Sequence, residues 1–64
     1  MSEVEKLAIG LFNHNIERGQ QVARDEGLDK IGMMPVRAEW ENMEEEDKNW
    51  WRNEARGKLY RRVE

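Results

Sequence analysis

The chain has 64 residues, a formal net charge of −3 and no cysteine, which predicts one domain, 1–64, without disulfides or thiolate metal sites. No apolar run approaches the roughly 20 residues of a membrane span, and the acidic, periodic residues 1–6 are unlike a signal peptide. We therefore expect a folded cytoplasmic protein that contacts no membrane. Its core should be thin, because few large apolar side chains are available to offset the ordering of the backbone.

A first helix is predicted over about 3–26. Ser2 precedes Glu5 by three residues, the spacing of a capping box in which each side chain accepts from the backbone N–H of the other residue. Apolar residues between 4 and 23 recur at helical spacing and form one broad stripe. Gly27 is placed to end the helix, since glycine readily adopts the left-handed conformation that follows many helices.

A connector with a short helix is predicted next. Residues 28–35 include Ile31, Met33 and Met34, which are too apolar for a fully solvated loop and are expected on the core. Pro35 disfavours helix before it and suits the first turn of a helix after it. A short helix is therefore expected near 35–43, with three large residues directed inward: Val36, Trp40 and Met43.

The last helix is predicted over about 44–62. Four acidic residues occupy its first turn, and basic residues follow toward its C-terminus, so the charges complement the helix dipole. Trp51, Ala55 and Leu59 follow at spacings of four and form its apolar line. The fold class is accordingly all-α, with two main helices and one short helix around a single core.

Catalytic and metal chemistry are not indicated. His14 is the single histidine, and a metal site would require further ligands at matched spacing. The acidic run 44–47 lacks the ligand spacing of a calcium loop and is typical of the first turn of a helix. Ser2 is the sole serine and has a capping role. We expect a protein that is not an enzyme and that needs neither metal nor cofactor.

Trp50 is the residue whose role the predicted core leaves open. It lies about 100° around the helix from Trp51, so both cannot face the same core. The interpretation favoured by the pattern is that Trp50 packs under the connector; the alternative is an exposed anchor of a protein interface. The candidate protein-binding residues are accordingly Trp50, Arg52, Arg56, Tyr60 and Arg61. The basic cluster that follows Trp51, with Lys58 and Arg62 included, is also the candidate surface for nucleic acid.

Two resemblances bear on function. The pattern Trp40-x2-Met43-x4-Lys48-x2-Trp51-x3-Ala55 resembles the second half of an HMG box, in which a tryptophan closes the second helix and an acidic turn opens the third. Pro35 and the acidic net charge depart from that family, so DNA bending is not carried over. The same pattern after an alanine–leucine helix is also similar to many short bacteriophage-encoded helical proteins, which are often directed at host proteins.

Three functional hypotheses follow. The first is a non-enzymatic, phage-type protein that binds a host or phage protein through Trp50 and the neighbouring arginines, in the host cytoplasm. The alternative is a divergent HMG-box-like protein that binds nucleic acid through the basic cluster. The third is self-association, as a homodimer, which would supplement the thin core.

Overall fold

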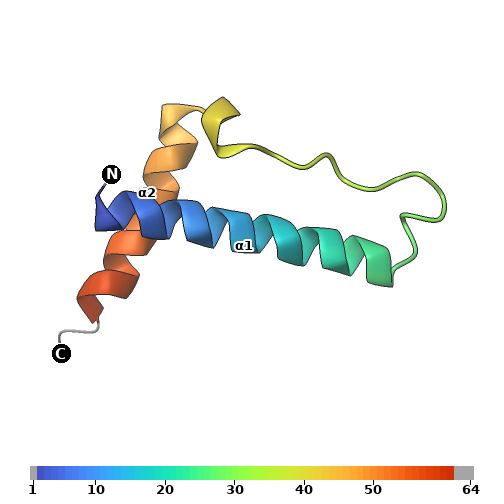
Figure 1. Cartoon of the computed structure of the whole chain (residues 1–64), viewed down its shortest axis with the longest axis horizontal. Helices are drawn as coiled ribbons and strands as arrows, with labels where there is room; N and C mark the ends of the chain where they lie inside the picture. The colour runs from blue at the N-terminus through green and yellow to red at the C-terminus, as the bar shows by residue number, and fades with distance from the viewer. Residues whose placement is uncertain (1, 62–64) are drawn as a thin grey trace.

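Two α-helices that cross near one end make up the fold (Figure 1). The computed structural model describes residues 2–61, and within them the chain forms α1 (Glu3–Asp25), the 3-10 turn η1 (Trp40–Asn42) and α2 (Glu45–Arg61), with no strand. The predicted all-α class is confirmed. The bounds of α1 and the start of α2 agree with the prediction to within one residue, whereas the predicted end of the last helix, residue 62, lies outside the described residues. Neither helix in the described residues combines the length and apolarity needed to cross a membrane.

The start of α1 is fixed by Ser2. Its hydroxyl oxygen accepts a hydrogen bond of 3.1 Å from the backbone N–H of Glu5, which satisfies one of the donors left free at a helix N-terminus. The second half of the predicted capping box is wrong. The Glu5 carboxylate bonds to Arg52 of α2, because a charged partner across the helix crossing binds a carboxylate more strongly than a neutral backbone N–H.

The end of α1 is fixed by Gly27, as predicted. Gly27 has φ +80°, and its N–H donates to the Arg24 carbonyl while the Leu28 N–H donates to the Ala23 carbonyl. These two bonds constitute a Schellman motif, which satisfies free carbonyls and turns the chain out of the helix. The connector then runs back alongside α1 toward its N-terminal half (Figure 1).

One buried alanine, Ala23, lies near the C-terminal end of α1, but most of the core is at the helix crossing. Ala8 and Ala55 are completely buried there, and Phe12 is 4% exposed; the two alanines lack bulk, so the helix backbones can approach closely. Trp51 and Leu59, on the predicted apolar line of α2, are half-buried. No large side chain among residues 2–61 is fully buried, which agrees with the thin core that the composition predicts.

The molecule is elongated because α1 extends well beyond the crossing. Its axes measure 45 × 27 × 17 Å and its radius of gyration is 14.3 Å, against about 11 Å for a compact domain of this length. The C-terminal half of α1 is accompanied by the connector rather than by α2 (Figure 1). A large fraction of the surface of both helices is therefore free of intramolecular contacts.

The connector differs from the prediction. Ile31 and Met33 are exposed, and Val36 is 95% exposed, so three residues expected on the core lie at the surface; Met34 is half-buried. Residues 33–39 are extended, and of the short helix near 35–43 only η1 forms. An extended segment spans more distance per residue than a helix, so these few residues can run back along α1 to the helix crossing.

Polar bonds along α1 hold the connector extended. The Gln20 amide donates to the Pro35 carbonyl at 2.9 Å, and the Arg37 guanidinium forms an ion pair with Glu17. A helix beginning at Pro35 would withdraw these groups from α1 and would have no second element on which to bury Val36. The side-chain bonds therefore compensate for the missing helical backbone bonds.

Candidate functional site

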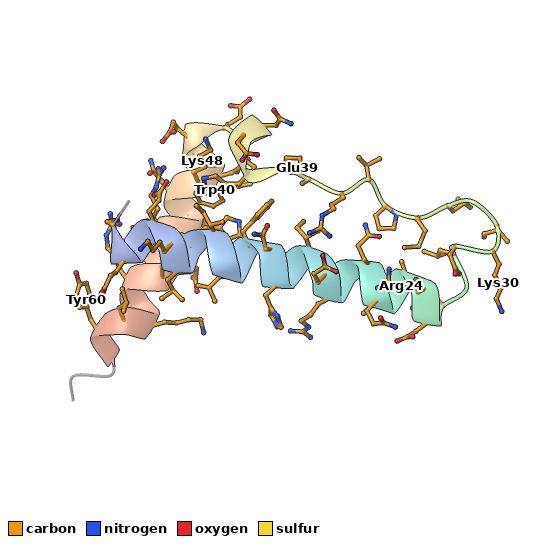
Figure 2. All side chains as sticks on the ribbon, in the orientation of Figure 1. Arg24, Lys30, Glu39, Trp40, Lys48 and Tyr60 are labelled. Atoms are coloured by element: carbon orange, nitrogen blue, oxygen red, sulfur yellow. The ribbon has the colours of Figure 1, made fainter. Side chains whose placement is uncertain are left out.

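Four aromatic rings form a continuous chain at the helix crossing. The Phe12 ring meets the Trp40 ring edge-on, with centroids 5.7 Å apart, and the Trp51 ring at 5.8 Å. Trp51 in turn meets Trp50 at 4.8 Å with an interplanar angle of 80°. Figure 2 shows Trp40 directed from η1 toward α1. Edge-to-face packing is the favoured geometry for aromatic pairs, so the three inner rings hold the fourth, Trp50, in a defined place.

Trp50 is the exposed end of this chain. Its side chain is 56% exposed, so the favoured interpretation that it packs under the connector is wrong; Trp50 has the exposure that the alternative requires, and its role as an interface anchor stays a prediction. The connector residue nearest to this position is Ala38, which lines the same hollow but is itself exposed. An alanine is too small to cover an indole, and the connector carries no bulky residue at this point.

A hollow of about 340 Å³ opens beside Trp50. Every main element contributes to it: Phe12 and Asn15 from α1, Ala38 and Met43 from the connector and the end of η1, and Asp47, Trp50 and Trp51 from α2. Its floor is aromatic and its polar groups are one carboxylate and one amide. We name this feature the corner hollow. It has the usual composition of a small binding site, an apolar surface with a few polar groups.

Arg52, one of the predicted binding residues, is engaged in bonds within the chain. Its guanidinium donates to both Glu5 carboxylate oxygens, at 2.6 and 3.0 Å, and to Glu45 at 2.9 Å. A further bond of 2.7 Å reaches Asn49, and the guanidinium lies 5.9 Å from the Trp40 ring. This bidentate bond joins α2 to the first turn of α1. Arg52 thereby lowers the pKa of Glu5.

The other predicted residues lie apart from the corner hollow. Arg56 is exposed and donates to Asn53 at 2.7 Å on the same helix. Tyr60 is exposed and projects from the opposite end of α2 (Figure 2). The side chain of Arg61 and the whole of Arg62 are outside the described residues. Of the four predicted site residues whose side chains are described, only Trp50 lines the corner hollow.

The sequence reasoning missed most of the corner hollow. Asp47 precedes Trp50 by three residues, so helical spacing alone places both on neighbouring positions of α2. Asn15, Ala38 and Met43 come from other elements, and no local pattern indicates that they meet Trp50. Only the crossing of the helices and the return of the connector bring these residues together.

One carboxylate, that of Asp47, lines the corner hollow, and the segment that precedes it is acidic. Residues 40–47 contain five acidic residues and no basic one: Glu41, Glu44, Glu45, Glu46 and Asp47. Glu45 is paired with Arg52, and its neighbours are exposed. No group of three or more His, Cys, Asp or Glu side chains in residues 2–61 is placed to hold a metal ion. The acidic surface therefore presents carboxylates to the solvent and to whatever enters the hollow.

Comparisons with known proteins give no relative for this arrangement. The chain matches no protein family, and no curated protein or solved structure matches it significantly. The functional inference accordingly depends on the geometry and the chemistry of the corner hollow.

Proposed function

We propose that this protein is a non-enzymatic binding module that captures another protein through the corner hollow and Trp50. The observation that carries the proposal is the exposure of Trp50, which three other aromatic rings hold at the edge of a hollow. Exposed, immobilised tryptophans are frequent anchors of protein interfaces, because a large area can be buried at low cost in side-chain entropy. The phage-type origin and the cytoplasmic location remain predictions within this proposal.

The chemistry of the hollow selects a basic, partly apolar segment of the partner. The aromatic floor accepts an aliphatic side chain, and the face of Trp50 attracts a cation. Asp47 supplies a carboxylate at the same place, and the acids of residues 41–46 add a negative potential that accelerates the approach of a positive partner. A lysine or arginine flanked by a large apolar residue satisfies all three features.

Selection of peptides from a random displayed library, with the immobilised protein as bait, tests the proposal. The selected peptides should share a basic residue next to a large apolar one. Their affinity should fall about tenfold or more for Trp50→Ala, the loss typical of an interface anchor. Asp47→Asn should weaken peptide binding less at high salt than at low salt, because salt screens the attraction between the Asp47 carboxylate of the wild type and the basic peptide.

Two further variants separate the corner hollow from the rest of the surface. Ala38→Gln should abolish peptide binding, because the longer side chain fills the hollow from the exposed connector. Tyr60→Ala should leave it unchanged, since Tyr60 lies at the other end of α2. Selection of acidic peptides, or equal affinities for wild type and Ala38→Gln, would contradict the proposal. Tight binding of duplex DNA at low salt would also contradict the proposal, if that binding depends on the basic residues of α2 and is unchanged in Ala38→Gln.

A further inference from the structure

The outward face of α2 carries a seam of evenly spaced residues. Glu46, Trp50, Asn53, Gly57 and Tyr60 are separated alternately by four and three residues, and all are exposed. This is the spacing of the residues that meet a second helix in a coiled coil. The seam lies opposite Ala55, the residue that faces α1, and Trp50 also borders the corner hollow on one side.

A second hollow interrupts this face where Gly57 lacks a side chain. It measures about 260 Å³ and is lined by Asn53, Glu54, Gly57 and Lys58. A Cβ atom at Gly57 would meet nothing within 4 Å, and glycine inside a helix costs about 1 kcal/mol relative to alanine. Glycine at this position therefore does not stabilise the monomer. It does leave a gap into which a large side chain of a neighbouring helix would fit.

Trp50 and this second hollow are complementary features of one helix. They are seven residues apart, which places them about 10 Å apart along the axis and nearly in line. Trp50 projects from the surface and the Gly57 hollow recedes into it. If two copies of α2 are placed antiparallel with Asn53 near the two-fold axis, each Trp50 reaches the Gly57 hollow of the other copy.

We propose that the protein forms a symmetric antiparallel homodimer through this face of α2, with each Trp50 seated in the Gly57 hollow of the other copy. A two-fold interface requires a self-complementary surface, and one projection with one matching recess is such a surface. This inference is independent of the proposed function, although both use Trp50: a dimer would cover part of the indole that the partner contacts.

The charge distribution of α2 specifies the antiparallel direction. Residues 44–47 are four acids, whereas residues 56–61 contain three basic residues and no acid. In the antiparallel register that sets Trp50 opposite Gly57, residues 46–51 of each copy, with two acids and one lysine, lie beside residues 56–61 of the other, with three basic residues and no acid. A parallel pair would place acids beside acids and bases beside bases, which costs free energy.

The thin core is consistent with association. The helix crossing buries few side chains, none of the large ones completely, and the elongated shape leaves the seam open. Small domains with so little buried apolar surface commonly gain stability from a second copy. Pairing along α2 would cover Trp50, the largest exposed side chain on that helix.

Sedimentation equilibrium of the wild type and of Gly57→Gln tests the dimer. The wild type should show a concentration-dependent monomer–dimer equilibrium. Gly57→Gln should weaken the dimer by about tenfold or more, since it fills the hollow, yet it should raise the thermal midpoint of the dilute monomer, because glutamine is the better helix former. A wild type that stays monomeric at high concentration, or a Gly57→Gln variant that dimerises equally well, would overturn the inference.

Disulfide crosslinking gives an answer even if Gly57→Gln does not fold. The chain has no cysteine, so Asn53→Cys introduces one thiol, close to the proposed axis and within the Cα separation that a disulfide spans. It should oxidise rapidly to a covalent dimer, whereas Asn13→Cys, exposed on α1, should not. Equal crosslinking of both variants contradicts the interface.

The two proposals fail separately. Ala38→Gln fills the corner hollow and should leave the dimer intact, whereas Gly57→Gln should dissociate the dimer and keep or strengthen peptide binding, because it uncovers the Trp50 indole. Loss of both properties in either variant would show that the two hollows are not independent sites, and would contradict the placement of Trp50 in the Gly57 hollow.

Discussion

The replacement Phe12→Ala should destabilise this fold more than any exposed substitution, because Phe12 is the ring on which the other aromatic side chains converge. It is 4% exposed and meets Trp40 and Trp51 edge-on at 5.7 and 5.8 Å. Truncation of a buried phenylalanine costs about 3–5 kcal/mol. A domain of 64 residues has a total unfolding free energy of about 3–10 kcal/mol, so the variant should be close to unfolded in water.

Urea denaturation followed by far-UV circular dichroism and by tryptophan fluorescence measures this loss. The midpoint should fall steeply, to a point where little or no folded baseline remains, and both signals should change together if the transition is two-state. The fluorescence of the variant should also shift to longer wavelength before denaturant is added, since Trp40 and Trp51 lose the ring that shields them.

Val36→Ala is the matched control. Val36 is 95% exposed, so its truncation should change the unfolding free energy by no more than about 0.5 kcal/mol. The sequence pattern predicts that Val36 is in the core, whereas the structure places it at the surface. The effect of Val36→Ala on the unfolding free energy therefore shows which of the two is right. Comparable losses in Phe12→Ala and Val36→Ala would refute the assignment of the core to the helix crossing.

Three further predictions concern the helix ends and their charges. Gly27→Ala should reduce the unfolding free energy by about 1–2 kcal/mol, since φ +80° strains any residue with a Cβ atom; Gly10→Ala, in the helix interior with open space around it, should stabilise the fold in the same denaturation assay. Ser2→Ala should cost about 1 kcal/mol through the lost cap at Glu5, whereas Ser2→Asp should retain the stability. Arg52 lowers the pKa of Glu5 below 4.5, so the ion pair stabilises the fold above that pH and its contribution is lost as the pH falls through the lowered value. The difference in urea midpoint between wild type and Glu5→Gln should accordingly be large at neutral pH and shrink in acid; a constant difference would contradict the ion pair.

Local signals in the sequence predict the helices well. Ser2 and Gly27 mark the two ends of α1 with residue types that suit those positions, and the acidic first turn marks the start of α2. Each of these signals acts within four residues of its own position. Both ends of α1 and the start of α2 follow from them, to within one residue.

The connector shows where local signals are insufficient. Pro35 is compatible both with the first turn of a helix and with an extended segment, so the residue itself does not decide. The connector is extended because Gln20 and Glu17 bond to Pro35 and Arg37, which lie 15 and 20 residues away from them in the sequence. Apolar content is equally ambiguous, because burial of Ile31 or Val36 requires a second surface that this small fold does not provide.

The candidate site was predictable in part, and the difference between Arg52 and Arg56 shows why. Arg52 precedes the buried Ala55 by three residues, so it lies about 60° from the core direction of α2, whereas Arg56 lies about 100° from it. An arginine at the edge of a buried stripe is partly desolvated and requires a carboxylate, which Glu5 supplies. Helical geometry thus indicates that Arg52 belongs to the fold, but its partner is 47 residues away and no local pattern names it. Trp50 packs against Trp51 on one side and is otherwise 56% exposed, so no intramolecular partner explains the rest of its surface, and the two proposals assign that surface to another molecule or to a second copy of α2.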